Sequence, residues 1–283
     1  MEPTIVQANG AEICVETLGD RDDPAILLVM GAAGSMDYWE DDFCASLVAG
    51  PRYVVRYDHR DTGQSTSYPP GAPGYTGDDL VRDPVALLDV LDLDAAHVVG
   101  LSMGGAIAQV MALDHRERVA SLTLIATSPG GPGEPDLPAM TDEGRAAFSD
   151  LVEPDWTDRA ATIDYMTQLS RACASRSHPF DEQGTRELSA RVLDRTTNIE
   201  SSMRNHYAAD GGDRWRERLG EIEVPTLVVH GTEDPAFPHG HGAALAREIP
   251  GAELLTLQGS GHELARRDWD VVVPAILRLT RGS

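Results

Sequence analysis

Short apolar runs alternate with amphipathic segments along much of the chain. Runs at 26–30, 53–57 and 97–100 are typical of strands that are buried on both faces. Amphipathic helices are predicted over 78–91 and 103–113, where apolar residues recur at helical spacing. The same rhythm continues with predicted strands at 122–125, 225–229 and 254–257 and predicted helices at 242–248 and 271–279. This order predicts an α/β fold with a mostly parallel sheet and helices on both faces.

The first two predicted strands are close neighbours in the sequence. They cover 4–7 and 12–17, and the turn-forming pair Asn9-Gly10 lies between them. Asn-Gly is a strong signal for a tight hairpin turn. We expect an antiparallel hairpin at one edge of the sheet.

The alternation stops between about 128 and 220. This segment opens with a run of turn-forming residues at 128–135 and shows no strand pattern. It contains three helical patterns, at 142–152, 157–170 and 181–197. The sequence therefore predicts a core domain made of residues 1–130 and 214–283 and a helical cap made of residues 131–213.

The composition excludes several classes of partner. The 283 residues include 46 Asp and Glu but only 23 basic residues, all of which are Arg, so the net charge is −23. Nucleic acids and anionic membranes are bound through basic surfaces, so neither is expected as a partner. No apolar run approaches the ~18 residues of a membrane helix. The first residues lack the basic start and apolar stretch of a secretory signal, so we expect a cytoplasmic protein. We also expect it to be a monomer or a homodimer.

The cysteines and histidines show no metal-binding pattern. Cys14, Cys44 and Cys173 are widely spaced and odd in number, so reduced thiols are expected rather than disulfides or a zinc site. His239 and His241 have the spacing of a ligand pair, but no third ligand follows nearby. Neither a phosphate-binding loop nor a dinucleotide fingerprint is present. We expect no metal and no cofactor.

The most informative motif reads Gly100-Leu101-Ser102-Met103-Gly104 and lies between a predicted buried strand and a predicted helix. A serine at such a sharp turn needs small neighbours because the backbone is crowded and strained. The turn exposes the Ser102 hydroxyl above the sheet and directs the Met103 N–H toward a developing negative charge. Ser102 is therefore the predicted nucleophile.

Candidate partners for Ser102 follow later predicted strands. Asp234 comes after the strand at 225–229, and His262 comes after the strand at 254–257. Carboxyl ends of parallel strands meet at one edge of a sheet, so these side chains are expected to converge on Ser102. His262 is the predicted general base and Asp234 the residue that orients it. Glu233 and Asp136 are lesser candidates for the acid.

An oxyanion hole requires a second backbone N–H. The loop at 31–35 follows the strand at 26–30 and has the position of a donor loop in this architecture. The Ala32 N–H is the predicted second donor beside Met103, and Gly31 is expected to lie against the substrate.

Three stretches of the chain, at 27–31, 56–66 and 96–104, resemble the α/β-hydrolase superfamily. Within it the sequence is most similar to the aclacinomycin methylesterase-like carboxylesterases. The resemblance implies a Ser102–His262–Asp234 triad with Ala32 and Met103 as oxyanion donors. Two positions depart from the usual pattern: Met30 stands where His is frequent, and Asp61 stands where Gly is frequent.

These features predict a serine hydrolase that cleaves a small to medium uncharged carboxylic ester through an acyl-enzyme, with a methyl ester of a polyketide-like metabolite as one case. Trp156, Tyr165 and Met166 are predicted to contact this small-molecule substrate from the cap. The same triad also supports lactone or carbon–carbon bond hydrolysis and cofactor-free perhydrolysis. A ligand-binding receptor that keeps the fold without catalysis is the alternative from another class.

Overall fold

The computed structural model describes residues 2–131 and 133–281, so residue 132 of the predicted cap and the chain ends 1 and 282–283 lie outside the described residues. Eight strands of the described chain form one sheet in the order β1-β2-β4-β3-β5-β6-β7-β8. The strands are β1 (Thr4–Ala8), β2 (Ala11–Leu18), β3 (Ala25–Val29), β4 (Tyr53–Tyr57), β5 (Ala96–Leu101), β6 (Val119–Ile125), β7 (Thr226–Gly231) and β8 (Glu253–Leu257).

The sheet is parallel from β4 to β8 and antiparallel only around β1 and β2. The predicted edge hairpin is confirmed, with β1 paired to β2 through Asn9 and Gly10. Both turn residues have positive φ angles, 45° and 74°, as a tight hairpin turn with the twist of the strands requires. The parallel part brings all of its strand carboxyl ends to one edge, where the candidate site lies.

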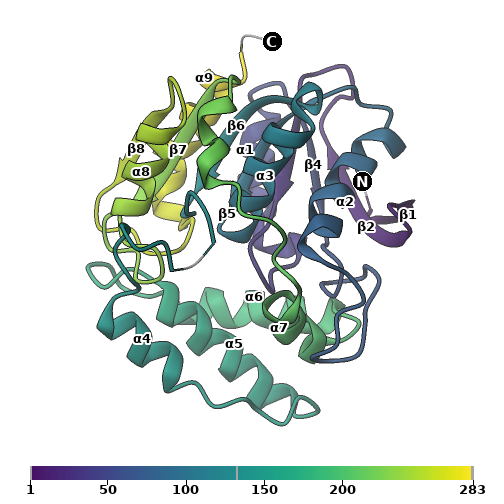
Figure 1. The fold of residues 1–283 in the computed structure, drawn as a ribbon. Coiled ribbons are helices and arrows are strands. Elements are labelled where there is room, and N and C mark those ends of the chain that lie inside the picture. The colour runs from purple at the N-terminus through teal and green to yellow at the C-terminus, as the bar shows by residue number, and fades with distance from the viewer. Residues whose placement is uncertain (1, 132, 282–283) are drawn as a thin grey trace.

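Helices cover both faces of the sheet, as expected (Figure 1). The helices α2 (Gly77–Val90), α3 (Met103–Asp114) and α8 (Gly240–Glu248) pack on one face, and α1 (Asp41–Val48) and α9 (Trp269–Leu279) pack on the other. Helix α1 was not among the predicted elements, because its eight residues give too short a periodic pattern. Short 3₁₀ helices lie at η1 (Met36–Tyr38), η2 (Arg116–Arg118), η3 (Arg216–Glu221) and η4 (Arg266–Asp268). No helix among the described residues is long and apolar enough to cross a membrane.

Four α-helices of the described chain lie between β6 and β7 and form a separate layer beyond one end of the sheet (Figure 1). They are α4 (Asp142–Ser149), α5 (Arg159–Cys173), α6 (Glu182–Arg195) and α7 (Ile199–Ala208). We call this layer the cap. Three of these helices match the predicted helical patterns, and α7 was not predicted. Its buried face includes Ser201, Ser202, Asn205 and His206, so no apolar periodicity marks it.

Candidate active site

Ser102 lies at a strained turn between β5 and α3. Its φ and ψ angles are 54° and −116°, a backbone conformation that residues other than glycine rarely adopt. The surrounding backbone leaves no space for larger neighbours: a Cβ atom on Gly100 would lie 2.2 Å from the Gly104 oxygen, and one on Gly104 would lie 2.1 Å from the Val29 oxygen. The glycines of the motif are therefore required by packing, and they keep the turn sharp.

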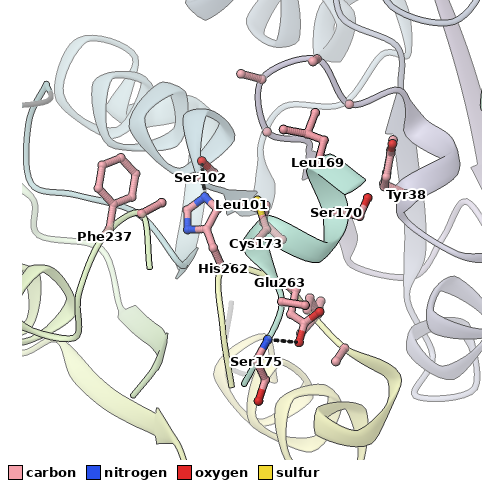
Figure 2. A pocket seen from close by; sticks show the side chains of 18 of the residues that line it. Tyr38, Leu101, Ser102, Leu169, Ser170, Cys173, Ser175, Phe237, His262 and Glu263 are labelled. Atoms are coloured by element: carbon pink, nitrogen blue, oxygen red, sulfur yellow. Dashed lines mark hydrogen bonds between the residues drawn. The ribbon is translucent and has the colours of Figure 1, made fainter. Parts of the chain in front are cut away.

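Three side chains from three strand ends form one hydrogen-bonded chain. His262 Nε2 lies 2.9 Å from Ser102 Oγ, and His262 Nδ1 lies 2.8 Å from Asp234 Oδ2. Figure 2 shows the His262 ring directed at Ser102 on the wall of the cavity. A carboxylate only accepts hydrogen bonds, so Nδ1 carries the proton and Nε2 is free to accept the Ser102 proton.

The Asp234 carboxylate is buried and held from several sides. Its Oδ1 accepts hydrogen bonds from the backbone N–H groups of Ala236 and Phe237, at 2.9 and 2.8 Å. The buried His230 contributes a further contact, with Nε2 3.4 Å from Oδ2. Burial alone would raise the pKa of Asp234, but the charge and hydrogen bonds of His262 and His230 outweigh it and hold the pKa well below its usual range. Asp234 is therefore ionised and fixed in orientation.

The two lesser acid candidates are engaged elsewhere. Glu233 accepts hydrogen bonds from the backbone N–H groups of Arg176 and Ser177, both at 2.9 Å, and from the Ser177 hydroxyl. Asp136 is exposed and forms an ion pair with Arg216. Neither carboxylate has a hydrogen bond to His262 among the described residues, so Asp234 is the acid that the geometry favours.

The predicted oxyanion donors lie on both sides of Ser102. Met103 is the first residue of α3, so its N–H has no acceptor within the helix. A Cβ atom on Gly31 would lie 3.3 Å from the Ser102 Cβ, which places the 31–35 loop against Ser102. Within the part of the chain that the structure describes, no hydrogen bond uses the N–H of Ala32 or Met103. Both groups therefore remain available to an oxyanion beside Ser102.

A cavity of about 1640 Å³ opens beside Ser102 and His262, between the strand ends and the cap. Figure 2 shows Leu169 and Cys173 of α5 and Phe237 of the core around this space. The cavity is larger than the ~300–1,000 Å³ of most small-ligand pockets. Among its mainly apolar lining residues are Met140, Phe148, Leu151, Leu188, Met203 and Tyr207. The site thus offers a large apolar space beside the Ser102 hydroxyl.

The residues predicted to contact substrate occupy different environments. Gly31, Ala32 and Tyr165 line the cavity, whereas Trp156 and Met166 are not among its lining residues. Met166 is only 1% exposed and packs inside the cap, and Trp156 stacks edge-on against Tyr165 with ring centroids 5.4 Å apart. The geometry does not support Trp156 and Met166 as substrate contacts. Successive helical residues are rotated by about 100°, so Tyr165 and Met166 face different ways.

The described residues contain no group of three or more His, Cys, Asp or Glu side chains arranged to hold a metal. His239 contacts the Thr256 hydroxyl, and His241 bridges Ser128 and the Pro138 carbonyl. All three cysteines are free, and burial raises the pKa of each thiol to about 12. None of them is therefore a thiolate nucleophile at neutral pH.

A mostly parallel sheet with a hydrogen-bonded Ser–His–Asp chain at its strand ends is typical of one class of hydrolases. The chain belongs to the alpha/beta hydrolase fold family, whose pattern matches residues 24–265.

Its relatives include the rhodomycin D methylesterase DauP of Streptomyces sp. (strain C5), 30% identical over 95% of this chain and 94% of that protein. A 2-hydroxy-6-oxononadienedioate/2-hydroxy-6-oxononatrienedioate hydrolase of Paraburkholderia xenovorans (strain LB400) is 29% identical over 76% of this chain and 72% of that protein. Among solved structures, the enol-lactonase of Burkholderia xenovorans LB400 is 26% identical, with a TM-score of 0.72 over 98% of this chain and 99% of that one.

Proposed function

We propose that this protein is a serine hydrolase that cleaves a carboxylic ester, with a bulky methyl ester as the favoured substrate. The observation that carries the proposal is the continuous chain of hydrogen bonds from Asp234 through His262 to Ser102. Beside it lie the backbone N–H groups of Ala32 and Met103, which have no acceptor among the described residues. A nucleophile, a general base, an orienting carboxylate and an oxyanion site are the parts that acyl transfer needs.

The geometry supports a two-step reaction. In the first step Ser102 Oγ bonds to the ester carbonyl carbon while its proton moves to His262 Nε2. The carbonyl oxygen becomes an oxyanion that accepts hydrogen bonds from the N–H groups of Ala32 and Met103. The carbon–oxygen bond to the leaving alcohol then breaks, and His262 returns the proton to that alcohol.

In the second step water attacks the acyl-enzyme. His262 takes a proton from the water, and the carbonyl carbon bonds to the resulting hydroxide. The bond to Ser102 Oγ breaks, the proton returns to Oγ, and the carboxylic acid leaves. Asp234 stabilises the imidazolium in both steps through its hydrogen bond to Nδ1.

The cavity favours a larger ester than this chemistry alone would require. A small ester would leave most of the 1640 Å³ filled with water, whereas a polycyclic body would contact the apolar lining. The similarity to DauP supports a methyl ester as the scissile group. The other two relatives are named a 2-hydroxy-6-oxononadienedioate/2-hydroxy-6-oxononatrienedioate hydrolase and an enol-lactonase, so the bond that this protein cleaves must be tested directly.

A fluorophosphonate label tests the nucleophile. The wild-type protein should be labelled at Ser102 and should hydrolyse p-nitrophenyl acetate, whereas Ser102→Ala should do neither while keeping the same circular dichroism spectrum. A folded wild-type protein without labelling or turnover would support a ligand-binding role instead.

A substrate panel then separates the reaction types. Methyl esters of a polycyclic aromatic acid, methyl acetate, a γ-lactone, a carbamate and a vinylogous 1,5-diketone should be compared by kcat/KM. We expect the polycyclic methyl ester to rank first. A higher kcat/KM for the lactone or the diketone would reassign the reaction while retaining the triad.

A further inference from the structure

The oxyanion loop at 31–35 contains a strained residue. Ala33 has a φ angle of 63°, although it is not a glycine, and it is only 5% exposed. A non-glycine residue in this region is strained and persists only where its surroundings hold it. Ala33 directly follows Ala32, so whatever holds Ala33 also sets the direction of the Ala32 N–H.

The surroundings of Ala33 come from helix α7 of the cap. The Ala33 N–H donates a 2.9 Å hydrogen bond to His206 Nδ1, and the Ala33 carbonyl accepts a 3.2 Å hydrogen bond from the Ser202 hydroxyl. Its methyl group packs in the apolar cluster that includes Met166 and Met203 of the cap. All three parts of this residue are therefore held by the cap rather than by the sheet.

The hydrogen bonds of His206 select one form of its ring. Nδ1 accepts from the Ala33 N–H, so Nε2 must carry the proton that is donated to the Arg60 carbonyl, at 2.9 Å. Only the neutral imidazole makes both bonds at once. Burial lowers the pKa of His206 to about 4, which keeps the ring neutral at ordinary pH.

A second buried histidine holds the start of the same loop. His59 Nε2 donates a 2.9 Å hydrogen bond to the Met30 carbonyl, immediately before Gly31. The rings of His59 and His206 are perpendicular, with centroids 5.6 Å apart. One ring comes from the core and the other from the cap, and together they hold both ends of the segment that carries the Ala32 N–H.

We propose that His206 is a positioning residue for the oxyanion hole: through its hydrogen bond to the Ala33 N–H it holds the Ala32 N–H in the direction that the transition state requires. The cap then has a part in the chemistry, in addition to enclosing the substrate. This inference rests on the proposed serine-hydrolase function, because an oxyanion hole has a role only if Ser102 attacks a carbonyl.

Two substitutions of His206 separate its two bonds. His206→Asn keeps an acceptor near the position of Nδ1, facing Ala33, and loses the bond to the Arg60 carbonyl. His206→Gln keeps a donor near the position of Nε2 and loses the acceptor for Ala33. Both remove the ring, so losses of packing are similar. His97→Gln is the matched control, because His97 is a buried histidine near the start of β5, at the end of the strand away from Ser102.

The readouts are kcat and KM for p-nitrophenyl acetate and the inhibition constant of a trifluoromethyl ketone, whose adduct with Ser102 carries an oxyanion. For His206→Gln we expect a 10- to 100-fold lower kcat and a KM within about twofold of wild type, since one oxyanion donor is worth ~10²–10³ in kcat. The inhibition constant of the ketone should rise by a similar 10- to 100-fold. His206→Asn should recover most of this loss. His97→Gln should lower the melting temperature without changing kcat.

Equal losses in His206→Asn and His206→Gln, or a folded His206→Gln protein with wild-type kcat, would overturn the positioning role. If His206→Gln does not fold, His206→Leu replaces it, because leucine also removes the acceptor for the Ala33 N–H. His206→Leu should lower kcat at least tenfold at unchanged KM, and a wild-type kcat overturns the role. An inactive wild-type protein that is not labelled by a fluorophosphonate contradicts the proposed function itself. An active wild-type protein with an insensitive His206→Gln variant contradicts only the positioning role.

Discussion

Arg195, the last residue of α6 in the cap, places its guanidinium 2.6 and 2.7 Å from the two carboxylate oxygens of Asp58, a fully buried residue of the core. Asp58 also accepts the backbone N–H groups of Met36 and Gln64, at 2.9 and 3.0 Å. The carboxylate thus connects the cap, the segment that follows β3 and the 58–66 turn. Arg195 also bonds to Asp37, so this end of the cap is fixed to the core by charge.

Removing Arg195 should therefore be costly. Arg195→Ala leaves the Asp58 carboxylate buried without its cation, and breaking such a pair typically costs ~3–5 kcal/mol of unfolding free energy. Arg159→Ala is the control, because Arg159 pairs with Asp194 on the exposed cap surface, where solvent screens the charges and the pair contributes little to stability. Urea denaturation measures both variants. Equal losses of stability would contradict the structural role of Arg195.

The acid of the triad can be tested by a pair of matched substitutions. Asp234→Asn should lower kcat roughly 10³–10⁴-fold, because an amide at this position favours the wrong imidazole tautomer. Asp136→Asn should change kcat less than twofold, since Asp136 forms an exposed ion pair with Arg216 and has no hydrogen bond to His262 among the described residues. Ester turnover under saturating substrate is the measurement. The reverse order would move the acid to Asp136.

The fold was accessible from the sequence because strands buried on both faces leave continuous apolar runs. The parallel arrangement in turn brought Ser102, Asp234 and His262 to one edge of the sheet, so strand order alone predicted that they converge. Their mutual distances in the structure agree with that prediction.

The cap was less accessible for two physical reasons. Helix α7 buries serine, asparagine and histidine side chains, so the period of its apolar residues is too weak to mark a helix. The bonds from His206 to Ala33 and from Arg195 to Asp58 join residues more than 130 positions apart. Contacts between such distant polar residues leave no local pattern, so the sequence could not predict that α7 packs against the 31–35 loop.

Tyr165 and Met166 are adjacent in α5, and truncating each one should affect a different property of the protein. Tyr165 lines the cavity, so Tyr165→Ala should change the ranking of methyl, aryl and short-chain esters by about tenfold in relative kcat/KM. Met166 is buried in the cap, so Met166→Ala should lower the unfolding free energy by ~2–5 kcal/mol and change the ranking little. A competition assay and urea denaturation measure the two effects. Unchanged selectivity in Tyr165→Ala would argue against this assignment of the cavity wall.

Acid should destabilise the protein partly through His206. Burial lowers the pKa of His206 to about 4, whereas an unfolded histidine titrates near 6.5. Between these values the unfolded chain binds a proton that the folded chain excludes, so the unfolding free energy falls as pH decreases from about 6.5 to 4. The contribution of one such histidine is about 1 kcal/mol per pH unit in this range. Stability should be pH-independent, as far as this group is concerned, above about 7.

His206→Gln provides the comparison, since glutamine does not titrate. The groups that face His206 are His59, Asp61 and Tyr75, and all of them are present in both proteins. His59 has a similarly lowered pKa of about 4, so acid loss of stability should persist in the variant, with a slope smaller by about 1 kcal/mol per pH unit. Urea denaturation at pH 7, 6 and 5 gives both slopes. Because protonation of His206 also breaks its bond to the Ala33 N–H, identical slopes in the two proteins would mean that His206 takes up its proton at the same pH in the folded and unfolded states and is not held as a neutral acceptor for the loop.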